Sequence, residues 1–389
     1  MKKTRFVALV TGLFMIAMVF QGCTSKGGDK PAGSQGGTTP AEAAAAEVSP
    51  TQSAAESVTP TEAASAGAPI LKADTDIAPD MSAADKQKHI EEIMEKSIAA
   101  PEPNPLVAIA RGTDYVSVTA EVVEKAGGLE GIIKEGDTVL IKPNICTLAE
   151  AGSGKITDYR AVQKVADMAY EMGAERVIIV EGTISGNAFS KSFLNLNKFD
   201  TLTGVELYNL NDSTKDNCYE LMPEGSMTKR ALFIPKIYMD ADVVISVAKL
   251  KTHFQPYAVV TLSLKNAIGV PSEKIYGGTG AKNGLHNIGL EQCIIDINKI
   301  RKPDFFIIEG IVGGEGYGPL RNTPVDSQIM FAGRDPVAVD TVALNFMGFT
   351  VDKVSHVRVA GEQNLGISDL SQIKVEGAVL DEIKMTFKR

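Results

Sequence analysis

Residues 243–269 read VVISVAKLKTHFQPYAVVTLSLKNAIG, and this segment indicates both the fold and the place of a site. Its first part, residues 243–247, is almost entirely apolar, which is typical of a strand buried on both faces of a parallel sheet. Charged and polar side chains follow at Lys249, Lys251, His253, Lys265 and Asn266. Burying an ammonium group costs several kcal/mol unless an anion compensates it. We therefore predict a site for an anionic ligand at the end of this strand.

Strands and helices alternate through the chain from residue 106 onward. Apolar segments of strand length lie at residues 106–110, 138–141, 177–180, 243–247, 305–308 and 328–331. The spacing of apolar residues predicts helices at residues 82–98, 117–126, 162–172, 285–300 and 335–347. Such alternation indicates an α/β fold with a mostly parallel central sheet and crossover helices.

The alternating pattern fits one large domain, residues 70–389. Residues 182–229 are polar and irregular apart from a short strand at 205–208, so we expect an excursion that walls or covers a site. The sheet is expected to resume at residues 231–234 and to end with an edge strand at residues 373–375.

The N-terminus carries a secretory signal. Three basic residues within the first five precede an apolar run at residues 6–20, which is too short to span a bilayer. The following Gly22-Cys23 resembles the end of a bacterial lipoprotein signal peptide. This resemblance implies cleavage after residue 22 and lipid attachment at Cys23; the alternative is an uncleaved anchor. Both interpretations predict an extracytoplasmic protein tethered to a membrane.

Composition limits the remaining possibilities. Residues 23–69 contain few large apolar side chains and are expected to form a flexible tether. A net charge of −9 argues against nucleic acid as a partner. Apart from Cys23, the cysteines are Cys146, Cys218 and Cys293. They form no CxxC pair for zinc or an iron–sulfur cluster.

Ligands of open parallel sheets bind beyond the carboxyl ends of the strands. The side chains expected there to bind an anionic small molecule are Lys142, Asn144, Glu181, Lys249, Lys251, Lys265, Asn266 and Glu315. His253 or His286 would transfer a proton, with Glu309 or Glu315 as partner. Each of these residues also has a plainer interpretation: a solvated rim charge, a structural histidine, or, for His286, a helix cap.

Two other kinds of site were weighed. The glycine-rich residues 277–283 and 313–318 lack the order of a phosphate loop or a dinucleotide fingerprint, so we expect mobile loops. Glu309, Glu315, Asp335 and Asp340 could together hold a hard metal ion, but Asp335 precedes Pro336 and better fits a helix N-cap. No cofactor is predicted from the sequence.

Several motifs resemble the domain-of-unknown-function family numbered 362. They are VLIKPN (139–144), ADVVISVAKLKTH (241–253), LSLKNAIG (262–269), IIEGIVGGEGYGP (307–319) and AGRDPVAVD (332–340). This resemblance implies no particular activity; many members look like iron–sulfur proteins, but this chain lacks their ferredoxin-type cysteine cluster. His253, Lys265 and His286 also give a fainter similarity to the nickel-pincer lactate racemase family, which implies acid–base work on a small hydroxy or carboxylate compound.

These observations leave three hypotheses of different classes. The first is a membrane-anchored lipoprotein enzyme that binds an anionic small molecule and uses histidine and lysine for acid–base chemistry. The second is a non-catalytic lipoprotein that captures an anionic ligand or cofactor. The third is a redox or maturation partner, which would require a bound cofactor.

Overall fold

The computed structural model describes residues 67–78, 81–184, 186–255, 258–278 and 281–389, all within one compact unit. The predicted signal peptide, the lipid-attachment residue Cys23 and nearly all of the predicted tether lie outside these residues. Within the described ranges, no helix has the length and hydrophobicity needed to cross a membrane.

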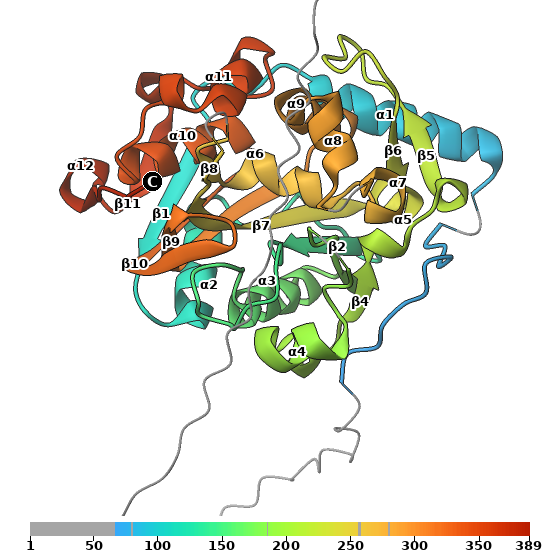
Figure 1. Ribbon diagram of the computed structural model, residues 1–389, viewed down its shortest axis with the longest axis horizontal. Helices are drawn as coiled ribbons and strands as arrows, with labels where there is room; N and C mark the ends of the chain where they lie inside the picture. The colour runs from blue at the N-terminus through green and yellow to red at the C-terminus, as the bar shows by residue number, and fades with distance from the viewer. Residues whose placement is uncertain (1–66, 79–80, 185, 256–257, 279–280) are drawn as a thin grey trace, which may run out of the picture. The chain divides into compact units, whose positions relative to one another are not determined.

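A mostly parallel sheet forms the centre of the domain, as predicted (Figure 1). Its strands lie in the order β11-β1-β10-β9-β7-β2-β3-β4, and the short β8 pairs with β7. Among these, β10 and β8 run antiparallel to their neighbours, and the other pairings are parallel. The strands are β1 Leu106–Arg111, β2 Thr138–Pro143, β3 Arg176–Glu181, β4 Glu206–Asn209, β7 Val243–Thr252, β8 Val260–Thr261, β9 Phe305–Tyr317, β10 Arg321–Gly333 and β11 Lys374–Gly377.

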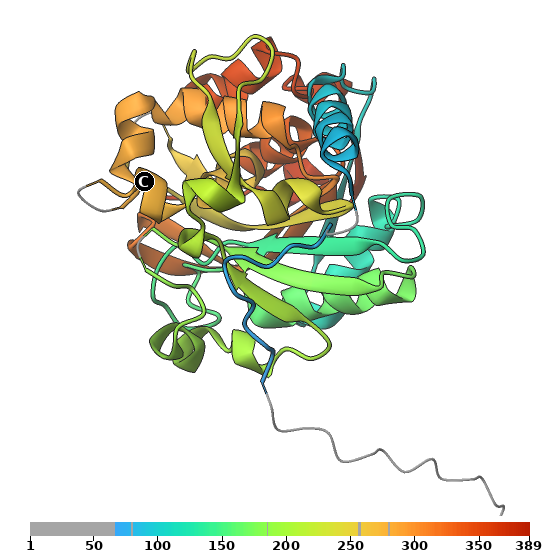
Figure 2. The same ribbon diagram turned by 90° about the vertical axis from the view of Figure 1, so that its right-hand side faces the viewer.

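Helices cover both faces of this sheet, with α2 and α3 on one face and α6, α8, α9, α10 and α11 on the other (Figures 1 and 2). The α-helices are α1 Ala83–Ile98, α2 Tyr115–Lys125, α3 Tyr159–Glu171, α4 Lys191–Asn197, α5 Lys236–Asp240, α6 Ser263–Asn266, α7 Glu273–Tyr276, α8 Asn283–Ile288, α9 Leu290–Ile300, α10 Pro336–Phe346, α11 Ser355–Glu362 and α12 Leu380–Ile383. This arrangement is the one expected when crossover helices connect parallel strands.

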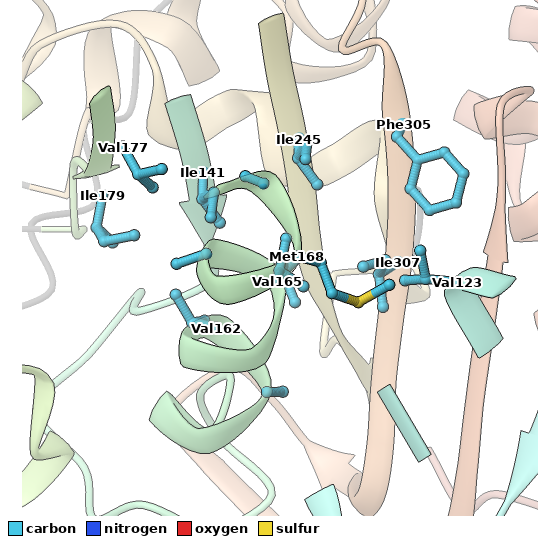
Figure 3. Packing of buried hydrophobic residues seen from close by; sticks show 14 of the residues in the cluster. Val123, Ile141, Val162, Val165, Met168, Val177, Ile179, Ile245, Phe305 and Ile307 are labelled. Atoms are coloured by element: carbon cyan, nitrogen blue, oxygen red, sulfur yellow. The ribbon is translucent and has the colours of Figure 1, made fainter. Parts of the chain in front are cut away.

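Alternate residues of the central strands belong to hydrophobic clusters on opposite faces of the sheet. Ile245 and Ile307 face α3, where Val162 and Val165 pack against them (Figure 3). Their neighbours in the strands, such as Ile308, face the opposite core under α9 and α10. Because both faces are covered, the strands are apolar almost without interruption, which explains why the sequence pattern located them.

The segment after β3 contains the predicted short strand. Its strand β4 pairs with β3 in parallel and lies at the edge of the main sheet. The prediction that residues 231–234 return to the sheet is wrong, because β6, Leu232–Pro235, pairs with β5, Cys218–Leu221, in a separate two-stranded sheet. A short apolar strand does not reveal which partner it joins, since the same pattern suits either sheet.

The prediction of a mobile loop at residues 313–318 is also wrong. Residues 313–317 belong to β9, which forms a long antiparallel hairpin with β10. A Cβ at Gly314 would lie 2.4 Å from the backbone oxygen of Gly154, and one at Gly313 would lie 2.8 Å from Ser327 Oγ. The glycines therefore allow close packing of a strand, where the sequence analysis expected mobility.

The single helix predicted at residues 285–300 is divided into α8 and α9. Gly289 separates them with a φ of +125°, which an L side chain rarely adopts. In contrast, Asp335 is the N-cap of α10 as predicted, because its Oδ1 accepts hydrogen bonds from the backbone N–H groups of Val337 and Ala338.

Candidate functional site

A cavity of about 450 Å³ lies beyond the carboxyl ends of β2, β3 and β7. Its wall also includes α6, the start of α8 and the turn between β9 and β10. The lining residues that the sequence analysis singled out are Asn144, Glu181, Lys251, His253, Lys265, Asn266 and His286. The predicted position, beyond the strand ends of an open parallel sheet, is thus where these side chains meet.

One lining residue, Glu181, belongs to a buried ion pair. Lys142 Nζ lies 2.8 Å from Glu181 Oε1, and both side chains are almost fully buried. The second carboxylate oxygen of Glu181 accepts a hydrogen bond from the backbone N–H of Ile145 at 2.7 Å. Since every one of these bonds lies within the wall, Lys142 and Glu181 hold the loops after β2 and β3 together.

Two asparagines connect this ion pair to the next lysine. Asn266 Oδ1 accepts hydrogen bonds from Lys142 Nζ at 3.3 Å and from Asn144 Nδ2 at 3.0 Å. Asn144 Oδ1 in turn accepts one from Lys251 Nζ at 2.7 Å. The chain of bonds fixes the orientation of both amides and joins β2, β7 and α6.

Lys251 is a buried cation that has no carboxylate bonded to it. Its ammonium donates to Asn144 Oδ1, to Cys146 Sγ at 3.1 Å and to the backbone oxygen of Lys155 at 2.5 Å. Burial lowers the pKa of Lys251, and the charge of Lys249 acts in the same direction. Because its three acceptors are neutral, they stabilise the protonated form of Lys251 and leave its positive charge uncompensated.

Lys265 comes from α6 and lines the same cavity half-buried. Its ammonium makes no hydrogen bond or ion pair with another residue in the described part of the chain. Burial lowers the pKa of Lys265 to about 8, and the neighbouring charge of Lys251 adds to this effect. An unpaired amine facing a cavity is a group that a ligand can engage.

His253 lies at the end of β7 and is 5% exposed. Its Nδ1 accepts a hydrogen bond from the backbone N–H of Gln255 at 3.2 Å. Burial strongly lowers the pKa of His253, followed by the charges of Lys265 and Lys251, so the imidazole is neutral near pH 7. Burial also lowers the pKa of His286, and the positive charge of Lys265 adds to this effect.

Two further cavity residues were not chosen from the sequence. Lys282 is 3% exposed and donates to the backbone oxygens of Gly182 at 2.9 Å and Gly269 at 3.1 Å. Burial lowers its pKa to about 7. It was missed because it lies in the glycine-rich segment that was interpreted as a mobile loop. The other is Cys146, a free thiol two residues after Asn144 in the sequence.

Besides Lys142, three predicted site residues do not line the cavity. Lys249 and Glu309 are opposite each other on β7 and β9 and form a fully buried ion pair of 2.5 Å. Burial raises the pKa of Glu309, while Lys249 acts against that rise. Glu315 lies further along β9, where it accepts a hydrogen bond from the backbone N–H of Lys388. These residues join strands and the C-terminal segment, and none of them lines the cavity.

The alternative metal site is not assembled among the described residues, where no group of three or more acidic, histidine or cysteine side chains could hold an ion. Asp335 caps α10, and Asp340 accepts hydrogen bonds from the backbone N–H groups of Ser263 and Leu264. Burial raises the pKa of Asp340 to about 7. Its position fixes α6, which carries Lys265 and Asn266.

Two buried polar atoms of the lining have no hydrogen-bond partner among the described residues. They are Thr261 Oγ1 and Gln255 Oε1. A buried hydroxyl or amide oxygen left without a partner costs roughly 1–3 kcal/mol. The Thr261 hydroxyl can therefore donate or accept a hydrogen bond when a polar ligand enters, and Gln255 Oε1 can accept one.

The lining carries more positive than negative charge. Lys251, Lys265 and Lys282 belong to it, whereas Glu181 is its acidic member within the described ranges and is already paired with Lys142. Apolar side chains, among them Ile184, Ile268, Leu290 and Leu320, complete the wall. A cavity with a few cationic groups on a largely apolar wall favours a small anion over a cation or a neutral sugar.

Comparison with known proteins places these residues within one family. The family described as "Domain of unknown function (DUF362)" matches residues 139–345, more than half of the 389 residues. A "Thylakoid-associated protein" of Synechocystis sp. is 27% identical over 250 residues, which cover 64% of this chain and 74% of that protein.

A crystal structure of a Thermotoga maritima protein is similar with a TM-score of 0.36 and 11% identity, over 55% of this chain and 54% of that one. This chain therefore spans about half the length of the Thermotoga protein. The similarity is too low to support an inference about the fold or the function.

Proposed function

The chain belongs to the DUF362 family, whose description assigns no activity, and from its cavity we propose that it binds an anionic small molecule and exchanges a proton with it. One observation carries the proposal: Lys251 and Lys265 line the same cavity, and neither is bonded to a carboxylate. An entering anion would compensate both charges and recover part of the cost of burying them.

His253 is the proposed proton acceptor, through Nδ1, which must first release its 3.2 Å hydrogen bond from the backbone N–H of Gln255. It is neutral because it is buried beside two cations. A bound anion would partly cancel these charges and so raise the pKa of His253 towards its ordinary range, which makes the imidazole a better base when the ligand is present. The geometry thus links ligand binding to proton uptake.

The direct test of binding is a thermal-shift screen of the full chain in detergent against carboxylates, phosphates and sulfonates. A ligand at 100 times its Kd stabilises the folded state by about 2.7 kcal/mol. Lys265→Met should reduce that stabilisation, whereas Lys374→Met, which changes an exposed residue of β11, should not. If no anion stabilises the wild-type chain, the proposal is wrong.

Proton transfer is tested separately with the anions that bind. In D2O, a general base exchanges the acidic carbon-bound proton of a bound hydroxy or oxo acid, and NMR follows the loss of its signal. His253→Gln should abolish this exchange and retain binding. If the wild type binds an anion without exchanging this proton, the result favours the second candidate, a non-catalytic capture protein. The strongly lowered pKa of His253 also favours that candidate, because it makes the imidazole a weak base.

We also propose that the protein is a lipoprotein attached to a membrane through Cys23, with its domain outside the cytoplasm. The signal in the sequence supports this, and the Synechocystis relative is named for its association with thylakoids. Wild-type cells should incorporate labelled palmitate into the protein. Cys23→Ser should lose the label, while Cys218→Ser, a buried cysteine of the domain, should keep it. Equal labelling of Cys23→Ser would contradict the proposal.

A further inference from the structure

The four lysines around the cavity differ in how many of their N–H groups are already used. Lys142 donates to Glu181 Oε1, Asn266 Oδ1 and the backbone oxygen of Pro143 at 2.8–3.3 Å. Lys251 also has three acceptors, at 2.5–3.1 Å. Lys282 has the backbone oxygens of Gly182 and Gly269, with a third at 3.5 Å. An ammonium has three donors, so these three lysines have little capacity left for a ligand.

Lys265 is the exception, because its ammonium has no acceptor among the described residues. Hydrogen bonds to acceptors favour the protonated form of a lysine, whereas burial favours the neutral form. The adjacent charge of Lys251 acts in the same direction. The pKa of Lys282 is lowered further, to about 7, but its nitrogen is already bonded to backbone oxygens. Lys265 is therefore the cavity lysine whose amine is open to a ligand.

We propose that Lys265 is a nucleophile that forms an imine with the carbonyl carbon of a bound oxo acid, while the fixed charge of Lys251 attracts the carboxylate. This inference rests on the proposed function and narrows the ligand to anions that contain a ketone or an aldehyde. The cavity of about 450 Å³ has room for such a small acid with a side chain.

The reaction is a balanced condensation. The lone pair of Lys265 Nζ attacks the carbonyl carbon, forming a C–N bond and converting the C=O group into a hydroxyl as a proton moves from nitrogen to oxygen. Loss of that hydroxyl together with the second nitrogen proton releases one water and leaves a C=N bond. No oxidant or reductant is required. Neutral His253 is the group on the wall that can accept and return the proton between these steps.

Borohydride trapping tests the imine directly. The full chain is incubated with pyruvate, 2-oxobutyrate, phenylpyruvate or 2-oxoglutarate, with and without sodium borohydride, and its intact mass is measured. We expect an irreversible mass increase of one reduced ligand only when both reagents are present. Peptide mapping should place it on Lys265.

Two variants sharpen this test. Lys265→Arg keeps the positive charge but cannot form an imine, so it should lose the adduct. Lys374→Met, on the exposed edge strand, should keep it. Because trapping is read on the wild-type chain, the test does not depend on whether Lys265→Arg folds.

The outcomes separate this inference from the proposed function. An adduct on Lys265 that is lost in Lys265→Arg supports both. Stabilisation by oxo acids without an adduct, or an adduct spread over exposed lysines, overturns the imine and leaves anion binding intact. Failure of every anion to bind or stabilise the chain overturns the proposed function itself.

Discussion

Lys142 and Glu181 form an ion pair with 2.8 Å between Nζ and Oε1, and each side chain is only 2% exposed. The two residues end neighbouring parallel strands, β2 and β3. Glu181 also accepts hydrogen bonds from the backbone N–H groups of Ile145 and Gly182. The pair is therefore a fixed part of the cavity wall, and the charge left to attract a ligand comes from Lys251 and Lys265.

Glu181→Gln should destabilise the fold strongly, because it leaves the ammonium of Lys142 buried without a counter-charge. Breaking a buried pair in this way costs about 3–5 kcal/mol, measured by urea unfolding. The matched control is Glu376→Gln, which breaks an exposed pair with Lys374 of 3.6 Å. That change should cost about 0–1 kcal/mol. Equal losses in the two variants would contradict the role given to the buried pair.

Gly269→Ala should disturb the same pair from the opposite side. An added Cβ would lie 2.5 Å from both Glu181 Oε1 and Lys142 Nζ, so the ion pair would have to move. We expect a loss of about 3 kcal/mol, at the upper end for overpacking, together with a smaller thermal shift on anion binding. Gly136→Ala is the control: its Cβ would meet nothing within 4 Å, although its φ is +86°. This variant should cost about 1 kcal/mol and leave the anion-induced shift unchanged.

The sheet could be predicted from the sequence because its strands are buried on both faces. Residues 139–141, 177–180 and 305–308 are apolar at every position, and each segment lies inside a strand of the structure. Antiparallel partners could not be found in the same way. The glycines of β9 resemble those of a loop, and the close approach of Gly313 to Ser327 and of Gly314 to Gly154 explains them.

The site was predictable where a charge follows directly from such a strand. Lys251 and His253 both line the cavity, as their position after the run 243–247 indicated. Lys249 follows the same run, but it faces Glu309 on the neighbouring strand. Lys282 reaches the cavity from a segment without strand or helix periodicity, so only the folded chain reveals it. Strand order and register decide such cases, and neither can be read from one sequence.

Acid should destabilise the protein partly through His253. The folded chain keeps this imidazole neutral, whereas the unfolded chain protonates it below its ordinary pKa of 6.5. The unfolded state then binds more protons, so stability falls as the pH drops through that value. One such group contributes a loss of about 1.4 kcal/mol between about pH 7.5 and 5.5.

In His253→Gln this contribution is absent, so the free energy of unfolding should change less over the same pH range. The pKa of His286 is also lowered, so some pH dependence of the free energy of unfolding should remain in the variant. Urea unfolding at the two pH values measures the difference. An identical acid dependence in the variant and the wild type would show that His253 is not held neutral in the fold.

Thr261→Val tests whether the hydroxyl of Thr261 contributes to the stability of the fold or to the affinity for a ligand. The buried Thr261 Oγ1 lines the cavity and has no hydrogen-bond partner among the described residues, so replacing it with a methyl group removes an unsatisfied atom. Stability without ligand should stay equal or rise by about 0.5–1 kcal/mol. If the hydroxyl bonds a bound anion, affinity should fall by roughly 2–10-fold, the loss of one hydrogen bond.

Thr252→Val is the matched control on the neighbouring strand. Thr252 is equally buried, but its Oγ1 donates to the backbone oxygen of Gly316 at 2.9 Å. Here the same substitution should cost about 1–2 kcal/mol of stability and leave affinity nearly unchanged. Urea unfolding and calorimetric titration of both variants give the comparison. A destabilised Thr261→Val with unchanged affinity would mean that its hydroxyl serves the fold, and the cavity would lose one of the two polar atoms that favour a ligand there.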